Sequence, residues 1–181
     1  MIRRILQTLL ITVLVASLSE GQATKTKETI FTRAAIEEYP EAERKPILEY
    51  LDSAKIVAGR VATNFATGSD EELDVDFSRL AKARGQKIFV REYVNMVRQV
   101  YGQVTSYEFR GQALEASAEN PDVHDLQRAR SAVYYAIRTA KRPEGELFLT
   151  VRTIRIGNFH AAAFLGVNDY KGNVPAWLQG K

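Results

Sequence analysis

The chain has 181 residues, of which 45% are hydrophobic and 26% are charged, as in an ordinary globular domain. This composition excludes a wholly disordered chain, a collagen-like repeat and a polytopic membrane protein. There is no cysteine, and the two histidines are His124 and His160. Disulfides, thiol catalysis, cysteine-ligated metals and a three-histidine metal site are therefore excluded. We expect neither a metal nor another cofactor.

Residues 1–23 have the pattern of a secretory signal peptide. Arg3 and Arg4 precede a run of 14 largely apolar residues over 5–18, and small residues lead to a cleavage point after Ala23. A bilayer-spanning helix needs about 20 apolar residues, so an uncleaved membrane anchor is the weaker alternative. We therefore expect a periplasmic or secreted protein that meets the membrane only through this segment, before cleavage.

The charge of the mature chain is nearly balanced. Cleavage removes two arginines and one glutamate and leaves 23 basic and 21 acidic side chains. Such a balance provides no long-range attraction to nucleic acid, and we expect no nucleic-acid partner. Acidic residues are in excess over 28–76 and basic residues over 77–160. Two explanations stay open: the halves complement each other within the chain, or a basic sheet face binds anionic envelope polymers or a partner protein.

Three helices are predicted in the first half of the mature chain. Residues 24–45 form a polar N-terminal arm with one helical turn at about 34–38. Apolar residues then recur every three or four positions over about 46–66, 70–84 and 86–101, which indicates helices with one buried face. Pro46 suits the first position of a helix, and the glycines at 68, 85 and 102 suit helix ends.

The second half is predicted to be a sheet. After Gly102 the apolar period becomes two, and strands are predicted at 104–116, 131–139, 146–156 and 159–167, the last three separated by short turn signals. Residues 169–181 are predicted to be a C-terminal tail anchored by Pro175 and Trp177. Helices followed by strands favour an α+β domain over 46–168, with three N-terminal helices packed on a four-stranded antiparallel sheet.

The order of these elements resembles the nuclear-transport-factor-two-like, or cystatin-like, α+β cone superfamily. The stretch over 97–109 (VRQVYGQVTSYEF) is the most suggestive, because a long helix stops at a glycine and the chain re-enters as the first strand. The resemblance covers about residues 46–167 and rests on element order. It implies a bent, cone-like sheet around the helices and a conical cavity. Such folds host enzymes, ligand binders and interaction modules, so the fold does not decide the function.

Four side chains are candidates for ligand binding: His160, Tyr93, Tyr101 and Tyr135. His160 lies in an otherwise apolar, alanine-rich strand that another element or a ligand can approach closely. It could serve as a general base or as a hydrogen-bonding pocket residue. The structural alternative is a histidine at the edge of the core or on the solvent face.

An isomerase-type site would also need a carboxylate base and tyrosine donors to an enolate. The carboxylates of the predicted strands, Glu108, Glu115 and Glu146, lie at strand ends or among polar residues. None of them is an obvious base, which weakens the interpretation of the protein as an enzyme.

Arg138, Arg152 and Arg155 are the basic residues within the last three predicted strands. The period of two places Arg152 and Arg155 on opposite faces of the sheet. An inward arginine can hold an anionic ligand through two parallel hydrogen bonds. The solvated face, covered by the arginine stems, is the favoured alternative.

The sequence therefore predicts an exported, non-catalytic α+β domain that binds a small ligand in its cavity or a partner protein on its sheet. Two alternatives belong to other classes: an isomerase or hydratase that uses His160 with a pocket tyrosine, and a structural envelope protein. A homodimer formed through the sheet also stays open.

Overall fold

The computed structural model describes residues 29–85, 90–116, 121–168 and 175–178. The predicted signal peptide over 1–23 lies outside these residues, as does most of the predicted tail. Within the described part of the chain, no helix is both long and apolar enough to cross a membrane.

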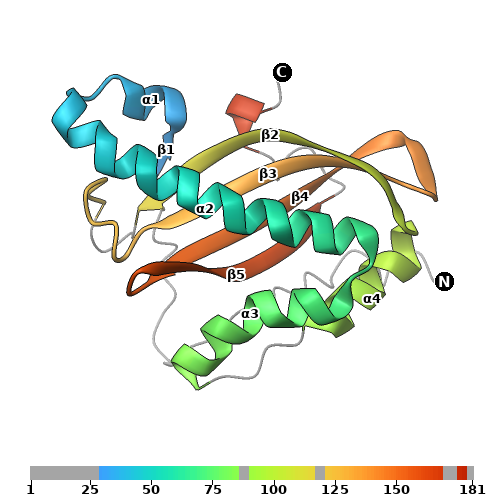
Figure 1. The fold of residues 1–181 in the computed structure, drawn as a ribbon. Coiled ribbons are helices and arrows are strands. Elements are labelled where there is room, and N and C mark those ends of the chain that lie inside the picture. The colour runs from blue at the N-terminus through green and yellow to red at the C-terminus, as the bar shows by residue number, and fades with distance from the viewer. Residues whose placement is uncertain (1–28, 86–89, 117–120, 169–174, 179–181) are drawn as a thin grey trace, which may run out of the picture.

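Helices pack on one face of an antiparallel sheet, so the protein belongs to the α+β class (Figure 1). The sheet has five strands in chain order, namely β1 (Thr29–Thr32), β2 (Val104–Ala116), β3 (Arg130–Thr139), β4 (Arg142–Ile156) and β5 (Phe159–Asn168). The helices are α1 (Arg33–Glu37), α2 (Glu41–Thr67), α3 (Asp70–Arg84) and α4 (Val90–Tyr101), and a short 3-10 helix, η3, covers Ala176–Leu178.

The three long helices and the four long strands are confirmed, but the counts of elements differ from the prediction. Part of the segment predicted to be a polar arm forms β1 and α1, and β1 pairs with the end of β2 from Thr29–Ala116 to Thr32–Ala113. The four residues of β1, TIFT, do not alternate between apolar and polar, so they lack the periodic signal of a strand. Helix α2 also begins five residues before Pro46, because Glu41 and Glu43 favour a helix N-terminus.

The sheet is not strongly curled, which corrects the bent, cone-like sheet implied by the resemblance. Sheets bend sharply where bulges repeat at matching positions of neighbouring strands. Here the shifts match at one level only, between residues 104 and 106 of β2 and between 137 and 139 of β3, at the end of the sheet. Those between 109 and 111 and between 152 and 153 lie at other levels. Helix α2, with 27 residues and a length of about 40 Å, can therefore lie across an open sheet.

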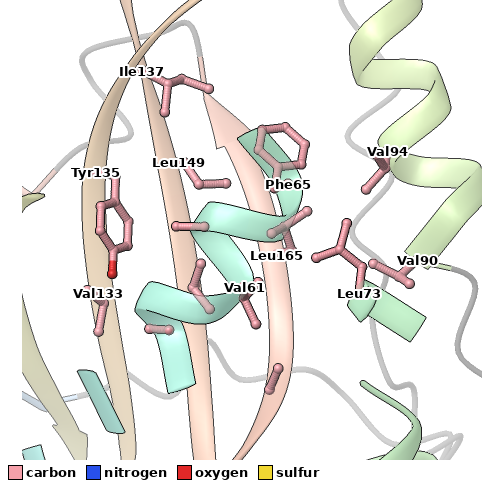
Figure 2. Close-up of a cluster of buried hydrophobic side chains, with 14 of the residues drawn as sticks. Val61, Phe65, Leu73, Val90, Val94, Val133, Tyr135, Ile137, Leu149 and Leu165 are labelled. Carbon is pink, nitrogen blue, oxygen red and sulfur yellow. The ribbon is translucent and has the colours of Figure 1, made fainter. Parts of the chain in front are cut away.

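The main hydrophobic core lies between the helices and the sheet (Figure 2). Helix α2 contributes Val61 and Phe65, and these side chains meet Ile137, Leu149 and Leu165 of successive strands. Leu73 of α3 and two valines of α4 close the cluster at the β5 side of α2. Among the described residues, buried side chains thus fill the space under the helices where the resemblance implied a conical cavity.

The opposite face of the sheet, here called the far face, is covered at its centre by the end of the chain. Trp177 and Leu178 pack with Tyr134 and Phe148, and the rings of Trp177 and Tyr134 meet edge-on with centroids 5.7 Å apart. A Cβ atom at Gly111 would lie 2.5 Å from the Trp177 ring. Glycine is therefore required for this approach, and Trp177 folds back onto the sheet.

A buried carboxylate also lies on the far face. The Nε atom of Arg152 donates to both carboxylate oxygens of Glu115, at 3.0 and 2.8 Å, and Glu115 is only 2% exposed. The guanidinium of Arg152 also lies over the Phe164 ring, 5.1 Å from its centroid. The sequence favoured a solvated Arg152, but the arginine is a partly buried counterion, because a buried carboxylate needs a charged partner.

Ion pairs join the acidic and basic halves of the chain. Arg98 of α4 bonds Asp70 of α3 at 2.7 Å, and Arg91 of α4 pairs with Asp74 of α3. These contacts support the intramolecular explanation of the uneven charge. A third acid, Asp76, is 2% exposed and accepts hydrogen bonds from Arg60 and Asn64 of α2, which fixes α3 against α2.

We expect Asp76→Ala to lower the free energy of unfolding by about 1.5–3 kcal/mol, because a charged hydrogen-bond acceptor is lost from a buried position. Asp52→Ala is the matched control. It removes a carboxylate that pairs with Arg33 at the surface, and its cost should stay below about 1 kcal/mol. Urea denaturation of both variants measures the difference, and equal losses would contradict the role given to Asp76.

We expect Gly111→Ala to displace the Trp177 ring, because the added methyl group would overlap with it. The chain has one tryptophan, so the emission spectrum reports directly on this contact and should shift to longer wavelength. Gly59→Ala is the control, since its Cβ would meet Tyr135 at an ordinary 3.7 Å. An unchanged spectrum in Gly111→Ala would show that Trp177 does not rest on the far face.

Candidate functional site

An open pocket of about 390 Å³ lies between α2 and the hairpin that joins β4 to β5. Its volume falls within the range of small-molecule sites, about 300–1,000 Å³. We call it the His160 pocket. Its lining comes from α2, from the loop before β3 and from the β4–β5 hairpin: Pro46, Glu49, Tyr50, Ser53, Val57, Leu126, Arg155, Asn158, Phe159 and His160.

Helix α2 supplies one wall through residues at helical spacing. Glu49, Ser53 and Val57 repeat every four positions and lie beside the buried stripe of the same helix. Tyr50 belongs both to the pocket lining and to the buried stripe of α2, because it lines the pocket and is only 3% exposed. Its Oη atom donates a hydrogen bond of 2.8 Å to the carbonyl oxygen of Ala129, which fixes the ring at the base of the wall.

His160 lies at the base of the pocket. It is the second residue of β5, it pairs with Arg155 of β4, and it is 8% exposed. Its ring meets the Tyr50 ring edge-on, with centroids 4.5 Å apart. The Nδ1 atom is buried and has no hydrogen-bond partner among the described residues. A buried polar atom of this kind is uncommon in folded proteins.

Burial keeps both aromatic groups neutral near pH 7. Burial lowers the pKa of His160 below its usual 6.5, and the positive charge of Arg155 lowers it further. Burial likewise raises the pKa of the Tyr50 hydroxyl, against a smaller opposing effect of Arg155. The charged groups that line the pocket are therefore Arg155 and Glu49.

Arg155 places a guanidinium at the pocket. Its Nε atom donates to the carbonyl oxygen of Gly157 at 3.0 Å, which ties the side chain to the hairpin turn. Among the described residues no carboxylate pairs with it. The sequence prediction that Arg152 and Arg155 lie on opposite faces is confirmed, because Arg152 pairs with Glu115 on the far face and Arg155 lines a pocket beside α2.

The structure does not bring the four predicted site residues together. The Oη atom of Tyr93 accepts a 2.7 Å hydrogen bond from the backbone N–H of Val167, and burial raises its pKa. Tyr101 ends α4 and lies beside Arg142, whose guanidinium is 5.1 Å from its ring centroid. The lining of the His160 pocket includes neither of these tyrosines.

Tyr135 belongs to a separate aromatic group. Its ring meets those of Tyr107 and Phe109 of β2, each at a centroid distance of 6.1 Å. Burial raises the pKa of Tyr135 to about 12. His160 therefore has Tyr50 as its aromatic neighbour in place of Tyr93, Tyr101 or Tyr135.

The buried carboxylates of the described residues lie away from His160. Asp76 pairs with Arg60, and Glu115 pairs with Arg152. Glu108 is exposed and pairs with Arg110, whereas the side chain of Glu146 lies outside the described part. Among described side chains, no group of three or more potential ligands could hold a metal ion. In the pocket itself the one carboxylate is that of Glu49, which is exposed.

Sequence analysis missed Tyr50 and the wall of α2. A signal was present, because residues 46, 49, 50, 53 and 57 follow helical spacing. That spacing places them on one side of a helix but does not say which strand end faces them.

Comparison with protein-family models, with curated proteins and with solved structures finds no match.

The lowered pKa of His160 predicts a pH-dependent loss of stability. In the unfolded chain His160 takes up a proton near pH 6.5, whereas in the folded chain it does so only at lower pH. The contribution of neutral His160 to the free energy of unfolding is therefore fully present above pH 6.5. Stability should fall as the pH decreases from 6.5 towards the folded pKa. His160→Phe keeps an aromatic ring against Tyr50 but cannot titrate.

Urea denaturation of both proteins between neutral and mildly acidic pH measures the effect. The stability of the wild type relative to His160→Phe should decrease steadily below pH 6.5. A constant difference across this range would show that the folded protein leaves His160 free to take up a proton.

Proposed function

We propose that the protein is an exported, non-catalytic domain that binds a small ligand in the His160 pocket. The observation that carries this proposal is the buried His160 ring at the base of an open pocket, with one nitrogen that lacks a partner among the described residues. The lining combines apolar side chains with several convergent polar groups, and such groups fix the orientation of a ligand in small-molecule sites. Export rests on the sequence pattern of residues 1–23.

Binding is favoured over the isomerase or hydratase alternative. Acid–base chemistry on His160 would need a second group within hydrogen-bond reach to orient the imidazole or share the proton. The buried carboxylates among the described residues are held by arginines elsewhere, at Asp76 and Glu115. The Tyr50 hydroxyl donates a hydrogen bond to the backbone carbonyl of Ala129, so it is already engaged.

Binding of a partner protein on the sheet, including a second copy of the chain, has less support. The helices cover one face, and Trp177 and Leu178 cover the centre of the far face. A structural role through a basic sheet face is also weakened, because Arg152 is engaged by Glu115. A relationship to the nuclear-transport-factor-two-like superfamily is supported by the order of elements and by the turn at Gly102, and it stands as a proposal.

Native mass spectrometry of the protein purified from the exported fraction of its host tests this function. We expect the mass of residues 24–181 together with a discrete non-covalent adduct. Ser53→Phe should abolish the adduct, because Ser53 lines the pocket from an exposed helical position where a larger side chain fills the space. Ile56→Phe is the matched control, since Ile56 is 73% exposed on the same helix and lies outside the pocket.

An adduct that survives in Ser53→Phe would place the ligand elsewhere. A wild-type protein without any adduct would contradict the proposal and favour the partner-binding or structural alternatives. An uncleaved mass would contradict removal of the signal segment without affecting the pocket.

A further inference from the structure

The charges of the His160 pocket restrict the ligand that it can hold. Arg155 is the one cation that lines the pocket, and its Nε atom is used by Gly157. The two terminal NH₂ groups of the guanidinium have no carboxylate partner among the described residues. A guanidinium in this state can form two parallel, charge-assisted hydrogen bonds with a carboxylate, sulfonate or phosphate group.

The imidazole adds a polar contact but no charge. His160 is buried and neutral near pH 7, so Arg155 is the sole positive charge available to a ligand. Glu49 places a carboxylate on the wall of the same pocket. A second negative charge on the ligand would be repelled by it, so the pocket suits a single anionic group.

The remainder of the lining is mixed: Ser53 and Asn158 are polar, and apolar side chains stand beside them. Phe159 is a large aromatic side chain that is 43% exposed at the start of β5. Together with Val57 and Leu126 it supplies apolar surface that a ligand could cover. Removal of this surface from water would contribute favourably to binding, at about 25 cal/mol per Å².

We propose that the His160 pocket is specific for a small organic monoanion, whose headgroup binds the Arg155 guanidinium and whose apolar body packs against Phe159. This inference rests on the proposed function, because it requires that the pocket binds a ligand. It adds the chemical class of that ligand and names Arg155 as the residue that selects it.

Two fluorescent dyes that share one ring system test the inference. Anilinonaphthalene sulfonate carries one negative charge, and phenylnaphthylamine is the same molecule without the sulfonate. The wild type should bind the sulfonate dye about tenfold or more tightly than the neutral dye, the difference expected of a charge-assisted pair. Added salt should weaken binding of the sulfonate dye and leave binding of the neutral dye nearly unchanged.

Variants assign the preference to Arg155. Arg155→Gln should lower the affinity for the sulfonate dye about tenfold and leave the affinity for the neutral dye nearly unchanged. Arg138→Gln is the matched control, because Arg138 is an exposed strand arginine that does not line the pocket. It should change neither affinity. Arg155→Lys should give an intermediate loss, since lysine keeps the charge but not the paired hydrogen bonds.

The outcomes separate this inference from the proposed function. If neither dye binds, or if Ser53→Phe leaves both affinities intact, the pocket is not a binding site and both proposals fail. If the wild type binds both dyes with equal affinity, or if Arg155→Gln lowers both affinities to the same extent, the pocket binds ligands but does not select an anion. If Arg155→Gln fails to fold, the salt dependence of sulfonate-dye binding by the wild type decides whether the pocket selects an anion.

Discussion

The packing of α2 across the sheet is the contact on which the rest of the structure depends. Helix α2 buries one face against β2, β3, β4 and β5. Two polar contacts fix its position: the Tyr50 hydroxyl donates to the carbonyl of Ala129, and the Gln112 amide donates to the carbonyl of Leu51 at 2.6 Å. The helix runs across the strands (Figure 1), and its N-terminal half also forms a wall of the pocket at the β4–β5 hairpin. The pocket therefore follows from the placement of one helix.

Charged groups divide into those that hold the fold and those that remain available. Asp76 and Glu115 are nearly fully buried, and each is satisfied by an arginine. Such pairs are costly to break, since the remaining partner loses its counterion. Arg155 has no such partner among the described residues, and His160 beside it has a buried nitrogen without one. Groups left in this state are candidates for binding, which is why we place the function at this end of the molecule.

The two faces of the sheet have different roles. The face under the helices holds the main core, which is apolar and filled (Figure 2). The far face holds the Glu115–Arg152 pair and is covered at its centre by Trp177. A ligand site in a filled core would require a cavity, which costs stability. At the margin of α2 the pocket is open to solvent, and it leaves the packing of the core intact.

The sequence by itself determined the elements, because they depend on local periodicity and on single residues. The three long helices, the four long strands and the left-handed helix ends at Gly68, Gly85 and Gly102 were all predictable. Tertiary structure decided the edge strand β1, which exists only through its pairing with β2, and the modest curl of the sheet, which depends on where bulges fall in neighbouring strands. It also decided the site: about 100 residues separate Tyr50 from Arg155 and His160, and no spacing rule acts over that distance. The packing of α2 on the sheet brings them together.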